Sequence, residues 1–168
     1  MTKVFVYGID GAPPELIFGE WLDELPNIKK LISNGAYAKL KSTIPPVTII
    51  AWSAFASGKD ASQIGVFSYT YKDEKTNDTR LISSKNVKTD MIWDVLGKYN
   101  KKSIVLNVPL TYPVKPINGI MVSCFLTPDI NSECTYPDNI KSRIKRLGDP
   151  KYFFDVWCNR LSQTGPAV

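Results

Sequence analysis

Short apolar runs recur along the chain and predict strands. Residues 4–9 (Val-Phe-Val-Tyr-Gly-Ile) form a continuous, largely β-branched and aromatic run, which is typical of a central parallel strand. Residues 37–42 alternate between apolar and polar positions and predict a second strand. Apolar runs at residues 103–108 and 119–123 predict two more. The polar stretch 72–80 predicts a surface loop or a hairpin.

Helical patterns lie between these runs. Pro13-Pro14 opens one helical stretch, and Pro26 opens a second that ends at Asn34-Gly35. A third helix is expected from Thr48 to Ser57, stopped by Gly58. Two further helices are predicted by their apolar faces: one capped by Asp90 with Ile92, Val95 and Leu96 facing the core, and one after Pro137 with Ile140, Ile144 and Leu147 on one face and Arg143, Lys145 and Arg146 on the other.

Strands that alternate with helices indicate an α/β fold, with a mostly parallel central sheet flanked by helices. With 168 residues, 43% of them hydrophobic, the chain can bury one sizeable core. The last residues, 161–168, carry no periodic pattern and are expected to form a tail.

Charge and cysteine content exclude several classes. The net charge of +5 is modest, and no zinc-finger, RNP or helix-turn-helix signature indicates dedicated nucleic-acid binding. The three cysteines, Cys124, Cys134 and Cys158, form no CxxC pair and predict reduced thiols in a cytoplasmic protein. The N-terminal apolar run is too short for a membrane span or a signal peptide.

Two segments carry residues suited to phosphate chemistry. Asp10 would stand at the carboxyl end of the first strand, where α/β sheets collect ligands, and Gly11 would let the backbone approach a ligand closely. Asp-Gly can equally be a simple turn. Thr48 would stand at a helix N-terminus, whose N–H groups and dipole favour phosphate and an ionised hydroxyl. Thr48 can equally serve only as an N-cap.

Several motifs, taken in order, resemble the type I phosphodiesterase/nucleotide pyrophosphatase branch of the alkaline phosphatase superfamily. The resemblance runs from about Lys3 to Tyr152. The matching motifs are Asp10-Gly11, Pro45-Pro46-Val47-Thr48, Ala51-Trp52, Ser57-Gly58-Lys59, Gly65-Val66-Phe67, Asn107 to Pro113, Asn118 to Ser123, Phe125 to Pro128 and Tyr136-Pro137.

The resemblance implies an alkaline-phosphatase-like fold and a metal-dependent phosphohydrolase. Asp10 would be a metal ligand, and Thr48 would be both the nucleophile and a ligand to the same metal. Two divalent ions, zinc or alternatively manganese, would assist in-line attack on phosphorus. Gly11 and the backbone N–H of Ile49 would contact the phosphoryl group. The substrate would be a phosphorylated small molecule or a nucleotide.

The sequence also departs from the family pattern. Ile50 replaces a proline, Ile64 a histidine and Ser68 an aspartate, and the chain contains no histidine. Because most family metal ligands lie in a later half, the resemblance implies that residues 1–160 are the N-terminal part of such a domain, with weak or no metal binding alone. A split enzyme and a degenerate, non-catalytic relative are the alternatives.

Other functions remain open from the sequence. The same fold without catalysis could bind a phosphorylated ligand or a protein partner. An incomplete domain would expose surface through which the chain could form an oligomer. A Rossmann dinucleotide site is disfavoured, because the chain lacks G-x-G-x-x-G.

Overall fold

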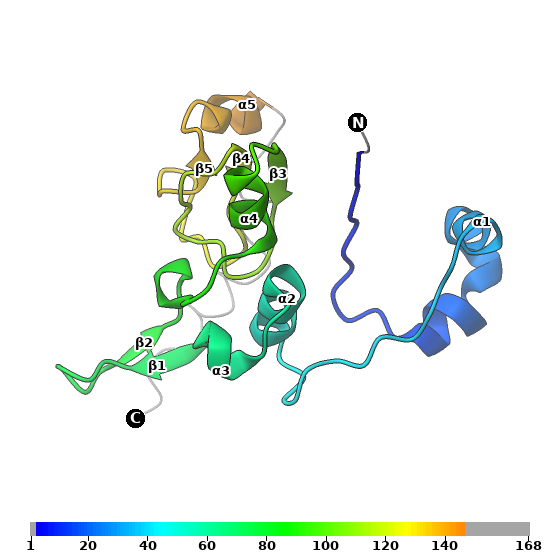
Figure 1. Ribbon diagram of the computed structural model, residues 1–168, viewed down its shortest axis with the longest axis horizontal. Helices are drawn as coiled ribbons and strands as arrows, with labels where there is room; N and C mark the ends of the chain where they lie inside the picture. Colours follow the sequence, from blue (N-terminus) through cyan, green and yellow to red (C-terminus); the bar gives the residue numbers. More distant parts are fainter. Residues whose placement is uncertain (1–2, 147–168) are drawn as a thin grey trace. The chain divides into compact units, whose positions relative to one another are not determined.

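The computed structural model describes residues 3–146, and the chain divides into two compact units (Figure 1). The first comprises residues 1–42 and the second residues 43–168, and each is described by itself. The expected tail at 161–168, together with Leu147 and Cys158, lies outside the described residues.

The first unit is helical. It contains a π-helical turn, η1 (Leu16–Glu20), a 3-10 turn, η2 (Leu22–Glu24), and helix α1 (Pro26–Asn34). Pro26 occupies the first turn of α1, where a missing N–H costs nothing. The helical stretch after Pro13-Pro14 and the helix after Pro26 are therefore confirmed.

The contacts described within this first unit lie near its surface. The rings of Phe18 and Tyr37 lie 5.1 Å apart, and the ammonium of Lys29 lies 2.6 Å from the Asp23 carboxylate. No described residue of this unit is fully buried.

Two predicted strands of the first unit are wrong. Residues 4–9 and 37–42 are not strands, and Val4 and Phe5 are 84% and 89% exposed. A strand forms only against a backbone partner, and neither segment takes part in a strand pairing among the described residues. The apolar pattern therefore reported a tendency toward extended structure and not a formed sheet.

The second unit opens with helix α2 (Thr48–Ser57) and helix α3 (Ala61–Ile64). Gly58 ends α2 in the left-handed conformation, as predicted, and its N–H donates to Ala54 O. The side chain of Asp60 accepts from the N–H of Gln63 and caps α3. These local signals explain why the boundaries of α2 agree with the sequence.

A hairpin and a small mixed sheet follow. Strands β1 (Thr70–Lys72) and β2 (Thr79–Leu81) pair antiparallel, which confirms the predicted hairpin. Strand β3 (Ser103–Leu106) pairs parallel with β4 (Gly119–Val122), and β4 pairs antiparallel with β5 (Thr135–Tyr136). The α/β class is thus supported, but among residues 3–146 the sheet is mixed and a mostly parallel central sheet is not confirmed.

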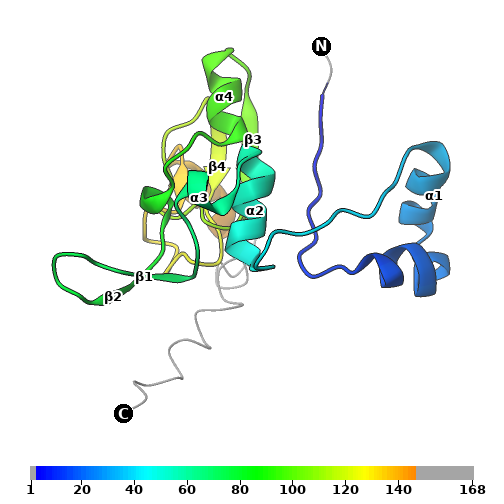
Figure 2. The same ribbon diagram turned by 60° about the horizontal axis from the view of Figure 1, so that its bottom comes forward.

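Three further helical elements belong to this unit: η3 (Ser84–Asn86), α4 (Ile92–Lys98) and α5 (Ile140–Arg146). Helix α4 packs against β3, as both views show (Figures 1 and 2). On α5, Ile144 is buried while Arg143, Lys145 and Arg146 are exposed, as predicted.

Asp90 does not cap α4, contrary to the prediction. The helix begins at Ile92, so the carboxylate of Asp94 accepts the Met91 N–H at 2.9 Å and Asp90 instead pairs with Lys98. This register buries Trp93 and leaves Ile92 and Val95 exposed. The predicted inward face of this helix is therefore wrong for both residues.

The core of the second unit consists of three clusters of buried side chains. The first is formed around α2, the second lies between α4 and the sheet, and the third lies beneath α5. Their members are Ile49, Ile50, Ile64, Val66, Ile82 and Leu110; then Ala56, Met91, Trp93, Val105 and Met121; then Val122, Cys134 and Ile144. Cys124 and Cys134 are free and buried, as expected of reduced thiols, and burial raises the pKa of the Cys134 thiol.

We expect Gly119→Ala to disrupt the parallel pairing of β3 and β4. A Cβ at Gly119 would lie 1.8 Å from the carbonyl oxygen of Ser103, and φ there is +147°. The substitution should lower the free energy of unfolding by about 3 kcal/mol. Gly97→Ala is the matched control: its nearest contact would be 3.7 Å from Asn118 Cβ, and inside a helix it should stabilise by about 0.5 kcal/mol. Urea unfolding measures both, and equal effects would contradict the pairing.

Ile50→Ala should lower the free energy of unfolding by about 2–5 kcal/mol, because Ile50 is 1% exposed and its removal leaves a cavity. Ile92→Ala removes the same atoms from a side chain that is 52% exposed. This control should cost less than about 1 kcal/mol. If Ile92→Ala lowered the free energy of unfolding by more than this, Ile92 would face the core, as the sequence predicted.

Candidate functional site

Thr48 is the first residue of helix α2, and the chain around it is tightly constrained. Val47 precedes it in extended conformation and accepts hydrogen bonds from the N–H groups of Ile50 and Ala51, at 3.0 and 2.9 Å. Val47 N–H in turn donates to Pro45 O at 3.0 Å. Thr48 itself is half-buried. Its hydroxyl is therefore carried on a fixed turn at the start of a helix.

The N-cap role considered for Thr48 is wrong. Val47 occupies that position, and its side chain has no oxygen with which to accept a backbone N–H. The N–H groups and the dipole at the start of an α-helix carry a partial positive charge. Such a terminus is well suited to an anion, above all to a phosphate group.

Core packing anchors the helix on the residues next to Thr48. Ile49 and Ile50 are 0% and 1% exposed and pack with Ile64, Val66 and Leu110. The Ile49 side chain is therefore part of the core, and a contact between its backbone N–H and a phosphoryl group stays a prediction. Where the family pattern has proline and histidine, Ile50 and Ile64 fill the core. Ile64, fully buried in this cluster, offers no donor atom.

Asp10 and Gly11 form an exposed turn in the first unit. Gly11 has φ of +66°, a conformation that glycine adopts without strain. The residues before the turn are extended and exposed, so the expected position of Asp10 at the end of a sheet strand is not seen among the described residues. The simple-turn interpretation of Asp10-Gly11 describes the local geometry. The structure places Asp10 and Thr48 in different units.

The two sequence-predicted metal ligands are fewer than a zinc ion usually takes. Asp10 and Thr48 supply one carboxylate and one hydroxyl, whereas a zinc ion takes about four ligands. Within residues 3–146 no group of three or more His, Cys, Asp or Glu side chains gathers to hold a metal. The sequence adds no imidazole, since it contains no histidine.

Sequence reasoning gave no role to Ser53, one turn further along α2. Its side chain is 1% exposed, and its hydroxyl oxygen has no hydrogen-bond partner among the described residues. The Ser57 hydroxyl, one turn further on, donates to the Ser53 carbonyl oxygen at 2.7 Å. No sequence signal separates these two serines, because only tertiary burial distinguishes them.

A comparison with protein-family models identifies the family. The model described as type I phosphodiesterase / nucleotide pyrophosphatase matches residues 4–158. The chain belongs to this family, as its motifs predicted. No curated protein and no solved structure matches the chain.

A separate finding concerns membranes. Among the described residues, no helix has both the length and the apolar character needed to cross a bilayer.

We expect Ser53→Ala to raise the free energy of unfolding by about 1 kcal/mol, because it removes a buried hydroxyl without a partner. Ser57→Ala makes the same change, but its hydroxyl has two hydrogen bonds to lose: it donates to Ser53 O and accepts from the Lys59 N–H. It should cost about 1 kcal/mol. Thermal or urea unfolding of the pair measures the difference. A loss at Ser53 would show that its hydroxyl has a partner in solution.

Proposed function

We propose that this chain supplies the nucleophile, Thr48, to a metal-dependent hydrolase of phosphoric esters or pyrophosphate linkages, and that the chain alone is inactive. The single observation that supports this most is the family match across residues 4–158, which spans the Thr48 segment. The position of Thr48 at the first turn of an anchored helix adds a physical reason. In this proposal Asp10 is a metal ligand, and Gly11 and the Ile49 N–H contact the phosphoryl group.

The chemistry available to Thr48 follows from its position. The hydroxyl oxygen would attack phosphorus in line with the leaving oxygen, forming an Oγ–P bond as the P–O bond to the leaving group breaks. The hydroxyl proton passes to solvent water. A water molecule later attacks the phosphorus, the Oγ–P bond breaks, and Thr48 regains its hydroxyl proton from water as the phosphate product leaves. The helix dipole lowers the energy of the ionised hydroxyl and of the phosphoryl oxygens near it. A hydroxyl still needs further activation at neutral pH.

Metal dependence belongs to the proposal as an expectation from the family. Zinc or manganese would supply Lewis acidity and an activated hydroxyl. Asp10 and Thr48 could serve as two of the ligands. Other donors would be needed beyond those that residues 3–146 bring together, as the expectation of an incomplete domain implies.

In a form that holds the metal ions, Thr48→Ala should abolish hydrolysis of a chromogenic phosphodiester measured with added Zn²⁺ or Mn²⁺. Thr48→Ser keeps the hydroxyl and should retain activity within about tenfold, since the nucleophile and the dipole remain. Thr79→Ala, on an exposed position of β2, is the matched control and should match the unchanged chain.

Asp10→Asn extends the same assay to the metal. It should raise the Zn²⁺ concentration needed for half-maximal rate, because a carboxylate ligand is lost. If Thr48→Ala hydrolysed the substrate at the unchanged rate, Thr48 would not be the nucleophile.

A second candidate is a non-catalytic module that binds a phosphorylated ligand at the same helix terminus. The donor set favours it, since the described residues gather no metal-binding group and Ile64 stands in the core. Phosphate titration followed by amide NMR tests it. Saturable shifts at residues 48–51, without turnover in a form that holds the metal ions, would support binding alone. No shift, and no turnover in that form, would contradict both functions.

A further inference from the structure

A basic cleft lies in the second unit, apart from Thr48. It is a shallow depression wide open to solvent, with a volume of about 490 Å³, and it is lined by Lys59, Val87, Lys88, Thr89, Asp90 and Lys115. Three lysines and one carboxylate give the lining a net charge of +2. Lys59 follows the C-terminus of α2, whereas Thr48 opens that helix, so about 15 Å of helix separates the two.

The positive charge of this cleft is only partly neutralised. Lys115 Nζ lies 2.6 Å from an Asp94 carboxylate oxygen, and Asp90 is hydrogen-bonded by Lys98. That bond lowers the pKa of Asp90, and the nearby charges of Lys115 and Lys59 lower it further. Neither Lys59 nor Lys88 forms an ion pair within the part of the chain that the structure describes. Two ammonium groups are thus left for an external anion.

Packing positions Lys88. Its N–H donates to Ile64 O at 2.9 Å, at the end of α3. Its methylene stem crosses Gly65 so closely that a Cβ there would lie 2.8 Å from Lys88 Cδ. The flexible side chain therefore loses part of its freedom before any ligand binds, which lowers the entropic cost of binding.

The walls indicate which anion would bind. Lysine ammonium groups act as point charges that suit phosphate oxygens, and the lining has no aromatic ring on which a base could stack. Val87 is the only apolar side chain among the lining residues. The hydroxyl oxygen of Thr89, which also belongs to the lining, is buried and has no hydrogen-bond partner among the described residues. A compact, multiply charged anion fits these features better than a nucleoside.

We propose that this cleft is a second anion site that binds a diphosphate group, either inorganic pyrophosphate or the diphosphate of a nucleotide, through Lys59 and Lys88. It does not depend on Thr48 chemistry. The site offers a place where a product or an effector of the same chemical class as the substrate binds away from the nucleophile.

Titration of the ¹⁵N-labelled full chain with inorganic pyrophosphate, in metal-free buffer at fixed salt, tests the proposal. We expect saturable amide shifts around Lys59, Lys88 and Lys115. Lys59→Gln and Lys88→Gln should each weaken binding about three- to tenfold, as expected for loss of one charge contact at a partly exposed site. Dispersed amide spectra confirm that each variant is folded.

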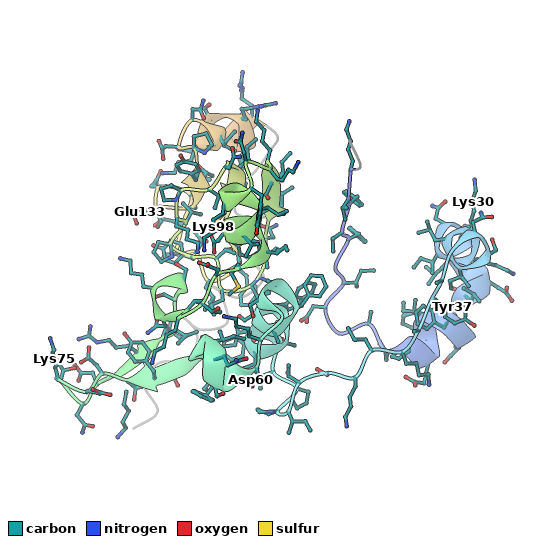
Figure 3. The ribbon with its side chains drawn as sticks, viewed as in Figure 1. Lys30, Tyr37, Asp60, Lys75, Lys98 and Glu133 are labelled. Carbon is teal, nitrogen blue, oxygen red and sulfur yellow. The ribbon has the colours of Figure 1, made fainter. Side chains whose placement is uncertain are left out.

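Lys75→Gln is the matched control, because it removes the same charge at the tip of the β1–β2 hairpin (Figure 3). It should change the affinity less than twofold. If Lys75→Gln lost as much affinity as the cleft variants, the binding would be attraction by the net charge of the chain, and the proposed site would be wrong. The absence of saturable shifts would also contradict the site.

Two further arms separate the ligand sources and the two sites. ADP binding as tightly as pyrophosphate, with adenosine not binding, would assign recognition to the diphosphate alone; adenosine binding here would overturn the assignment. Thr48→Ala should leave pyrophosphate shifts at the cleft unchanged. Loss of these shifts in Thr48→Ala would contradict a separate site, whereas loss of hydrolysis alone bears only on the proposed nucleophile.

Discussion

Burial of helix α2 is the constraint on which the second unit depends. Ile49 and Ile50 at its start belong to one core cluster and Ala56 near its end belongs to another, so this helix joins the two clusters. Each fully buried isoleucine contributes about 2–3 kcal/mol through removal of apolar surface from water. Because both ends of the helix are fixed by packing, Val47 and Gly58 set where the chain enters and leaves. The positions of Thr48 and Lys59 are consequences of this burial.

The same packing limits the chemistry. Ile50 and Ile64 occupy positions where the family pattern has proline and histidine, and both are buried in the cluster around α2. An apolar side chain there adds stability but removes a donor atom. The helix terminus keeps its electrostatic preference for phosphate, since that preference comes from the backbone. The backbone at the start of α2 thus carries a partial positive charge, while the side chains of Ile49 and Ile50 beside it form hydrophobic core.

Ion pairs on the surface affect the availability of lysine side chains more than they affect stability. The described ion pairs, such as Lys29–Asp23 and Lys98–Asp90, are largely exposed and contribute little to stability. Their effect is to decide which lysines remain available. Around α4, Asp90 and Asp94 neutralise Lys98 and Lys115, and the charge of Lys59 and Lys88 is left over. Lys59 and Lys88 therefore bring to one part of the surface two ammonium groups that form no ion pair among the described residues, which composition alone did not indicate.

Local signals in the sequence determined several elements. The bounds of α1 and α2, the β1–β2 hairpin and strands β3 and β4 agree with prediction, because Pro26, Gly58 and short apolar runs act within a few residues. The linked motifs likewise determined the family.

Tertiary structure decided the rest. Residues 4–9 needed a pairing partner to become a strand, the start of α4 determined that Trp93 and not Ile92 is buried, and Lys59, Lys88 and Lys115 meet only through folding. Strand pairing, burial and charge clustering depend on contacts between residues distant in sequence, which no local pattern encodes.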